Sequence, residues 1–422
     1  MGGLTTTLET AKKTILNSQT QIHTASHNIA NAENPAYTRQ KAVVQTSIPQ
    51  STPFGWLGTG ATVQKITQMR DEFVEKKLLR NVADESFHST RESSLSTAGA
   101  YLNADGESGI PQGMAEFWDS WDVLSQNPEG LVQRENVYQA AANVADEISR
   151  TGADLEQVTA DLQEELESNI APANDLLSVI ADYNRQIATY ETDARPANDL
   201  RDLRFEAMKE LSAYVSFDYH EGPNGSVTLT GTGPDQPELV KNWSFEELAV
   251  EDVSAETGGK LGGLVSSMES VEKYRQRLDD FAAELTAQVN GTHAGGAVFD
   301  GAPPASAMAL DGAFTVDTID GSNAAEMAGL QNVRFAALGD STFNEYWQDM
   351  EQELYTEQSQ AGTKADFQSS LNVELESRRQ DLSGVSIDEE MVEILKHQQV
   401  FQAAAKIVQR TDQMIQSVIN MV

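Results

Sequence analysis

The sequence contains no cysteine and no long apolar run. Without cysteine, disulfides, thiolate metal ligands and cysteine nucleophiles are excluded. No apolar stretch approaches the roughly 18 residues of a membrane-spanning helix. The first residues, MGGLTTTLETAKKTIL, also lack the apolar core and cleavage site of a secretory signal peptide. We therefore expect no membrane insertion, and we expect any export to proceed without a cleaved signal.

Basic residues are scarce as well. The 422 residues include 29 Lys and Arg against 65 Asp and Glu, which gives a net charge of −36. Such a charge repels nucleic acids and anionic lipid surfaces, so we expect protein partners. The excess of acidic residues lies in residues 81–380, which contain 17 basic and 54 acidic residues. Residues 1–80 contain 9 basic and 5 acidic residues. The middle of the chain is predicted to face water, and its ends are predicted to contact other subunits.

Both ends of the chain show a coiled-coil pattern, in which apolar or small residues recur at alternating spacings of four and three. In the first segment these positions are Leu4, Leu8, Ala11, Ile15, Ser18, Ile22, Ala25 and Ile29. In the last segment they are Ile387, Met391, Ile394, Gln398, Phe401, Ala405, Val408, Asp412, Ile415, Ile419 and Val422. We expect the first and last helices to pack on each other, with neighbouring subunits completing a thin seam. The alternative is two helices that dock separately on a globular core.

The interior is predicted to be helical with two short β regions. Helical spacing predicts two long helices, at 137–187 and 264–289, and a kink is expected at Pro172 in the first of them. Shorter helices are predicted at 69–98, 114–124, 198–214 and 343–381. The GGKLGG run at 258–263 is interpreted as a flexible turn. An Asn224-Gly225 hairpin signal and three Asp-Gly turns within 297–335 indicate strands.

These patterns predict a mainly α fold, an elongated helical bundle with small β inserts and a chain of two to four units. We expect a terminal coiled-coil assembly domain (1–66 with 381–422), a helical rod domain (67–212, 264–292 and 343–380), a small β insert (213–263) and a β-rich insert (293–342).

The sequence offers no motif for catalysis or for a cofactor. His23 and His27 stand four residues apart, as metal ligands on a helix would, but HTASH lacks the glutamate of a zinc-protease motif. Both histidines fall on outward heptad positions, which favours a solvated or subunit-contact face. GGKLGG lacks the Ser or Thr that follows the lysine of a phosphate loop. We therefore predict no catalytic residue, no metal, no cofactor and no enzymatic activity.

The end of the first helix carries a more specific motif, SHNIANAENPAYTRQ. Asn28 and Asn31 can bond the last turn of the helix, and Pro35 cannot continue it. An extended run is expected to start at Tyr37-Thr38-Arg39-Gln40 and to end at Val43-Val44. The stretch resembles the NIANxNTPGY signature of bacterial flagellar axial proteins, and TRQ is similar to the hook-associated protein 1 family. Ala36 stands where that signature has glycine, so a positive φ there would cost about 1 kcal/mol.

Three further segments resemble the same family. They are ANDLRDLRFEAMKELSAYV (197–215), LTAQVNGTHAGG (285–296) and the C-terminal SGVSIDEEMVEILKHQQVFQAAAKIVQRTDQMIQSVINMV (383–422). The C-terminal motif is the most specific, because rod and hook proteins share a shorter core of it. The resemblance therefore covers both ends and the frame between them.

The resemblance implies an extracellular structural adaptor that joins the flagellar hook to the filament after export by the flagellar type III apparatus. Its expected partners are neighbouring subunits, the hook protein, a second junction protein or the filament protein, and an export chaperone. The residues expected at the assembly interface are Leu4, Leu8, Ile15, Ile22, Asn28, Ile29, Asn31, Pro35, Tyr37, Arg39, Met391, Ile394, Phe401, Ala405, Val408, Ile415 and Ile419. The chaperone is expected to cover Ile394, Phe401, Val408 and Ile415. The alternatives are a hook or distal rod subunit, and an enzyme carried on a flagellar frame.

Overall fold

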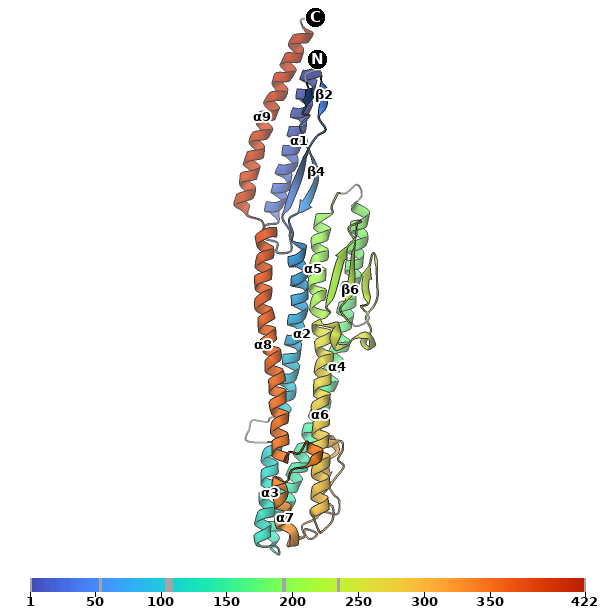
Figure 1. The fold of residues 1–422 in the computed structure, drawn as a ribbon, viewed down its shortest axis with the longest axis vertical. Coiled ribbons are helices and arrows are strands. Elements are labelled where there is room, and N and C mark those ends of the chain that lie inside the picture. Colours follow the sequence, from blue (N-terminus) through green and yellow to red (C-terminus); the bar gives the residue numbers. More distant parts are fainter. Residues whose placement is uncertain (1, 53–54, 103–108, 192–194, 234–235, 421–422) are drawn as a thin grey trace. The chain divides into compact units, whose positions relative to one another are not determined.

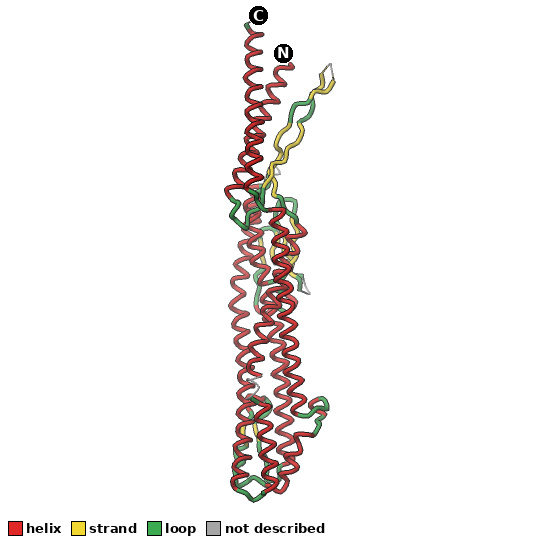
Figure 2. The backbone as a smooth tube through the Cα atoms, turned by 90° about the vertical axis from the view of Figure 1, so that its left-hand side faces the viewer, coloured by secondary structure: helices red, strands yellow, loops and turns green. Residues whose placement is uncertain are grey.

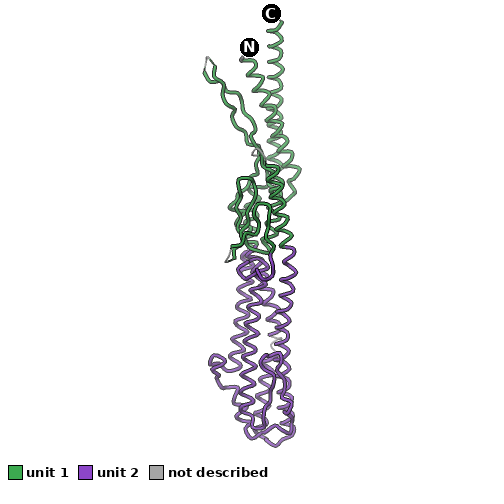
Figure 3. Tube along the Cα trace, turned by 90° about the vertical axis from the view of Figure 1, so that its right-hand side faces the viewer, with its two compact units in different colours: residues 1–82, 173–247, 369–422 green, residues 83–172, 248–368 purple. Residues whose placement is uncertain are grey.

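The computed structural model describes residues 2–52, 55–102, 109–191, 195–233 and 236–420. They form two compact units (Figure 3). The first unit comprises Met1–Val82, Ala173–Glu247 and Ser369–Val422, and the second comprises Ala83–Pro172 and Leu248–Gln368. Helices dominate and the sheets are small and antiparallel, so the predicted fold class is confirmed.

In the first unit, the terminal helices α1 (Gly2–Ala30) and α9 (Ile387–Ile419) pack side by side (Figures 1 and 2). They run antiparallel, because the end of α1 lies beside the start of α9. The Ser386 side chain accepts a hydrogen bond from the Glu389 N–H and caps α9, and acidic residues in the first turn suit the helix dipole. The prediction that the two ends pair is confirmed.

A long hairpin follows α1. Its strands are β1 (Gln40–Thr46), β2 (Gln50–Thr52), β3 (Gly55–Leu57) and β4 (Ala61–Gln68). β1 pairs with β4, and β2 with β3. The hairpin packs on α1, where Asn17 Nδ2 donates to the Ala61 carbonyl at 2.7 Å. We call Gln40–Gln68 the arm.

The rest of the first unit is built from helices and a small sheet. The helices are α5 (Asn198–Tyr214), the start of α2 (Glu72–Leu102), and the C-terminal parts of α4 (Leu131–Tyr190) and α8 (Phe343–Ser383). The sheet contains β5 (Phe217–Glu221), β6 (Val227–Gly231), β7 (Glu238–Lys241) and β8 (Ser244–Phe245) in that order. Gly225, with φ +77°, turns β5 into β6, so the Asn-Gly hairpin is confirmed.

The second unit contains the remaining parts of α2, α4 and α8 together with α3 (Ile110–Gln126), α6 (Gly259–Thr292) and α7 (Ala324–Gly329). Its core is aromatic, with Phe117, Trp121, Phe281 and Trp347 almost fully buried. Burying such large side chains is the main favourable term in forming this unit.

Two expectations for the second unit need correction. Gly262 and Gly263 lie inside α6 instead of in a flexible turn. A Cβ on Gly263 would stand 2.8 Å from the Phe87 carbonyl oxygen, so glycine is needed for the close approach of α2 to α6. Residues 293–342, all of them described, contain two strands of two residues each, β9 (Phe299–Asp300) and β10 (Ala309–Leu310), with turns and short helices elsewhere.

Pro172 lies inside α4 without ending the helix, and the boundary between the two units falls directly after it. The family-like segment at 285–296 has a structural role. Asn290 Oδ1 accepts hydrogen bonds from the backbone N–H groups of Val298 and Phe299, at 2.7 and 3.0 Å. These bonds hold the chain that follows α6 against the helix end.

Candidate assembly site

The first helix contributes one continuous face to the helix pair. All eight seam positions expected on α1 are buried or half-buried, with Ala11, Ser18 and Ala25 almost completely enclosed. These small residues let the helices approach closely, and the larger residues Leu4, Leu8, Ile15, Ile22 and Ile29 flank them. The period of the sequence therefore locates the α1 side of the seam.

The seam on α9 differs from the expected one at half of its positions. Ile394, Phe401, Val408 and Ile415 are half-buried, as the pattern requires. The second set of seam residues is Glu390, His397, Ala404 and Thr411, one position before Met391, Gln398, Ala405 and Asp412. Met391 and Ile419 are 53% and 65% exposed, whereas Ala405 is half-buried; Val422 lies outside the described residues. Three of the four true positions are polar, so hydrophobic periodicity could not indicate them.

As a result, α9 keeps a large apolar surface outside the helix pair. Eight large apolar side chains on it are exposed, and Ile387 and Ile419 lie at its two ends. We call the other six the α9 flank: Met391, Val392, Leu395, Val400, Ile407 and Met414. Val400, Ile407 and Met414 follow one another at spacings of seven and form one row along the helix. Exposed apolar side chains of this kind are typical of a protein contact.

Asn28 joins the end of α1 to the start of α9 and to the arm. Its Nδ2 donates to the Gln40 carbonyl at 2.9 Å and to Glu390 Oε2 at 3.1 Å. Its Oδ1 accepts from the Tyr37 hydroxyl at 2.8 Å and from the Gln40 N–H at 3.0 Å. The side chain is almost completely buried, so these four bonds satisfy a group that would otherwise destabilise the fold.

Glu390 is the charged member of this cluster. Its side chain is 5% exposed, and the Arg39 guanidinium binds it at 2.7 Å while also reaching Glu389 at 3.0 Å. The Arg39 backbone N–H donates to the Ser383 carbonyl at 2.8 Å, at the end of α8. Arg39 therefore fixes the link between α8 and α9.

Helix α5 supports the same region through its NDLRDLR segment. Asp202 accepts from the Thr38 N–H at 3.0 Å and from Gln68 Nε2 at 2.6 Å. Burial raises the pKa of Asp202 to about 6, although these bonds oppose the rise. Asn198 Nδ2 donates to the Ile66 carbonyl at 3.1 Å. Gln40 Nε2 donates to Asp199 Oδ1 at 2.7 Å, so α5 holds both ends of the arm.

The turn after α1 is relaxed. Asn34 Oδ1 accepts from the Ala36 N–H at 3.1 Å, and Arg379 of α8 donates to the Pro35 carbonyl at 2.7 Å. Among the described residues, positive φ outside glycine occurs at Gln236, Asn242 and Asp340, so Ala36 carries no such strain. Asn31 Nδ2 bonds the His27 carbonyl at 3.0 Å and closes the last turn of α1.

The two histidines have different surroundings. His23 is exposed, as expected, but His27 is half-buried with Nδ1 2.9 Å from the Tyr37 hydroxyl. His27 therefore belongs to the Asn28 cluster, a role that the heptad pattern did not indicate. Within the described residues, no three His, Asp or Glu side chains are grouped to hold a metal ion. Nor is any described helix long and apolar enough to span a membrane.

A family model described as the flagellar hook-associated protein FlgK helical domain matches residues 96–308, which is half of the chain. The chain belongs to the FlgK family. A second model, the C-terminal region of flagellar basal body rod FlgEFG proteins, matches residues 380–421. The predicted family is confirmed, and the homologues are structural proteins of the flagellum.

Named relatives of this FlgK-family chain include flagellar hook-associated protein 1 of Bacillus subtilis. It is 24% identical over 98% of this chain and 97% of the relative. The protein of that name from Salmonella typhimurium is 24% identical over 67% of this chain and 55% of its own length. A solved structure of the flagellar hook junction protein FlgK from Burkholderia pseudomallei covers 53% of this chain and 46% of that one, at 19% identity and a TM-score of 0.44.

Several residues of this FlgK-family site were not predicted from the sequence, notably Glu390, Asp202 and Arg379. Glu390 and Asp202 lie within the family-like segments, so the motifs pointed to the right stretches. Their partners lie 362 and 164 residues away along the chain, at Asn28 and Thr38. Local spacing cannot indicate contacts over such separations.

A second buried ionic cluster lies beside the first strand of the sheet, in the same unit. Glu75 Oε2 is 3.5 Å from Arg70 and 3.3 Å from the Tyr219 hydroxyl, and Arg70 also binds Glu221. Burial raises the pKa of Glu75 from 4.5 to about 7, and Arg70 opposes this rise. The folded chain therefore binds a proton at Glu75 that the unfolded chain has already released between these pH values.

Stability should fall with rising pH because of this group. The stabilisation of the fold that comes from protonated Glu75 is fully present below pH 4.5 and is lost by about pH 7. The reason is that the folded chain binds the extra proton between these pH values. We expect Glu75→Gln to be about 3 kcal/mol more stable than the natural chain at pH 8, with little difference near pH 4.5. Urea unfolding at both pH values, followed by a ¹⁹F label on Trp243 in the adjoining sheet, measures this.

The matched control is Glu238→Gln, on strand β7 of the adjoining sheet and exposed, which should change stability by less than about 0.5 kcal/mol at either pH. An equal effect of Glu75→Gln at the two pH values would contradict the assignment.

Proposed function

We propose that this chain is the structural subunit that joins hook to filament, and that it assembles through its paired terminal helices. The observation that carries the proposal is the α9 flank, because α1 covers one face of α9 and leaves the apolar side chains of the flank exposed. A helix pair with so much remaining apolar surface is suited to contact neighbouring subunits. The family and the relatives named hook-associated protein 1 support the same role.

The proposal includes the partners and the route. The subunit would be exported by the flagellar type III apparatus to an extracellular position, between the hook protein on one side and a second junction protein or the filament protein on the other. An export chaperone would cover Ile394, Phe401, Val408 and Ile415 before α1 packs on them. The interface would also include the Asn28 cluster, with Asn31, Pro35, Tyr37 and Arg39, which fixes the helix pair to the rest of the first unit.

The role would be purely structural. The charged groups near the helix pair neutralise one another: Arg39 is paired with Glu390, and Lys396 with Glu393.

Deleting the gene in the source bacterium tests the proposal. A junction subunit predicts cells that keep hooks but lack filaments, with filament protein released into the medium, and restoration by the natural gene. Loss of the hooks themselves would favour the alternative of a hook or distal rod subunit, which the match of residues 380–421 to rod proteins allows. Normal filaments in the deletion strain would contradict any axial role.

A further inference from the structure

Two buried carboxylates hold the base of the arm. Asp202 of α5 accepts hydrogen bonds from the chain on both sides of the base, at Thr38 and Gln68. Glu75 of α2 lies 3.5 Å from Arg70, which follows Gln68 by two residues. Only 7% of Asp202 and 3% of Glu75 is exposed. The place where the chain enters and leaves the arm therefore depends on the charge of two buried groups.

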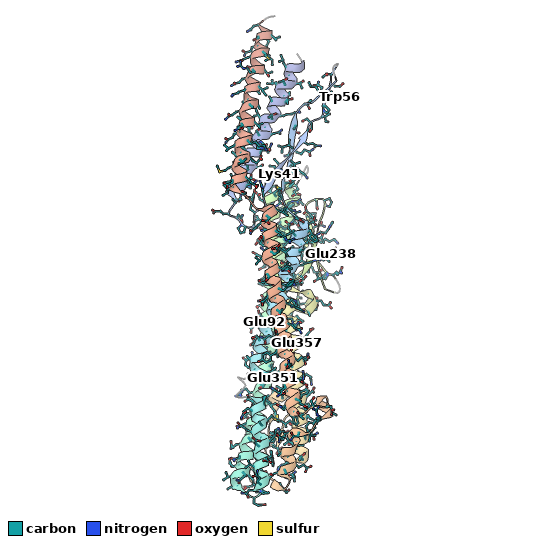
Figure 4. All side chains as sticks on the ribbon, turned by 60° about the vertical axis from the view of Figure 1, so that its left-hand side comes forward. Lys41, Trp56, Glu92, Glu238, Glu351 and Glu357 are labelled. Atoms are coloured by element: carbon teal, nitrogen blue, oxygen red, sulfur yellow. The ribbon has the colours of Figure 1, made fainter. Side chains whose placement is uncertain are left out.

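The base is also where the two strands of the arm meet the rest of the first unit. In Figure 4, Lys41 lies near this base and Trp56 at the outer part of the arm. The Met69 N–H donates to the Arg39 carbonyl at 2.8 Å and closes the base. Helix α1 contacts the arm farther out, so Asp202 and Glu75 act on the base alone.

Neither carboxylate has a full counter-charge. Asp202 accepts from uncharged donors, and no Lys or Arg among the described residues forms an ion pair with it. Glu75 shares the one arginine beside it, because Arg70 also binds Glu221. A buried carboxylate without a full counter-charge favours its protonated form.

The other charges around the base are bound to one another. Arg201 is paired with Glu191 and Glu221, and Arg379 with Glu376. His27 lies 3.8 Å from Asp199 and can also bind a proton, so a test has to separate it from Asp202. The titratable and charged groups that face Asp202 and Glu75 from the packed elements are His27, Tyr37, Arg70, Asp199, Arg201, Tyr219, Glu221 and Arg379.

Both carboxylates shift in the same direction. Burial raises the pKa of Asp202 from 3.8 to about 6 and the pKa of Glu75 from 4.5 to about 7. If the base opens, water hydrates both groups and their pKa values return toward the ordinary ones. The closed base therefore binds protons that the opened base releases. Its closure is favoured in acid and weakens as the pH rises through these two raised values.

We propose that Asp202 and Glu75 form a proton-controlled joint, which holds the base of the arm firmly when both carboxylates are protonated and loosens it when both are ionised. The first unit would then have a fixed arm base in acid and a looser one near neutral pH. The joint lies within one chain, so this inference goes beyond the proposed function and does not depend on it.

Amide hydrogen exchange of the purified full chain tests the joint. Exchange at residues 36–41 and 66–70 is measured at pH 5.5 and pH 8 and divided by the intrinsic rate at each pH. We expect the opening constant of these amides to rise about tenfold or more between the two pH values, whereas the amides of β6 and α6 should change less than about threefold. Equal opening constants at the two pH values, or an even rise throughout the first unit, would overturn the joint.

Asp202→Asn combined with Glu75→Gln removes both titrating groups and keeps side chains of similar shape. In this variant the amides at 36–41 and 66–70 should show no rise in the opening constant between pH 5.5 and pH 8. The matched control, Glu210→Gln with Glu238→Gln, removes two exposed carboxylates from α5 and β7 and should keep the rise, as should His27→Gln. A rise that persists without Asp202 and Glu75 would assign the effect to another group and contradict the proposal.

Discussion

Phe401→Asp combined with Val408→Asp should abolish assembly while leaving the second unit folded. Both side chains are half-buried in the seam against α1. Each substitution loses about 1–2 kcal/mol of apolar burial and places a carboxylate where it cannot be fully hydrated. A helix pair of this length is only marginally stable, so we expect at least a hundredfold loss of attached filaments.

Filament counts by electron microscopy and hydrogen exchange measure the two parts of this result. Exchange should accelerate in residues 2–30 and 387–419 and stay slow in 259–292. The control, Gln399→Asp with Gln409→Asp, adds the same charge to exposed positions of α9 and should assemble normally. A normal junction in the seam variant would show that the helix pair is not required. Normal release of the variant into the medium would separate an assembly defect from lost chaperone binding.

Arg39→Met should cost the first unit about 3–5 kcal/mol. It leaves Glu390, with 5% of its side chain exposed, as a buried charge without its cation. The double variant Arg39→Met/Glu390→Gln should recover most of that loss, because removing both charges removes the unpaired one. Urea unfolding of Arg39→Met, Glu390→Gln and the double variant gives the coupling energy between the two side chains.

The surface pair Arg378 and Glu374 provides the matched control. Both side chains are more than half exposed, one turn apart on α8, and Arg378→Met should cost less than about 1 kcal/mol. Equal losses for Arg39→Met and Arg378→Met would contradict the role given to the buried pair.

The helices could be predicted from the sequence because their signals are local. The α1 seam follows from residues spaced by three and four, and the expected helices at 69–98, 114–124, 198–214 and 343–381 correspond to α2, α3, α5 and α8. The α9 seam was half wrong because Glu390, His397 and Thr411 are buried there. The burial of Glu390 depends on its partners Asn28 and Arg39, which the local pattern does not contain.

The arm was predicted in part. The extended run after Thr38 is β1, but its partner β4 carried no clear alternation of apolar and polar residues. Its exposed outer face and the bulge between Val43 and Val44 obscure the two-residue period. The division into four parts remains a prediction, and so do the individual interface residues.

The first unit is assembled from three separate stretches of sequence, whereas both stretches of the second unit precede residue 369. A chain that emerges from its N-terminus can therefore complete the second unit while Arg39 still lacks Glu390, since the two are 351 residues apart. The last residues to arrive complete the structure that the first residues began. Any product cut short before α9 would have no helix to pair with α1, so the fold itself would keep incomplete chains out of the assembly.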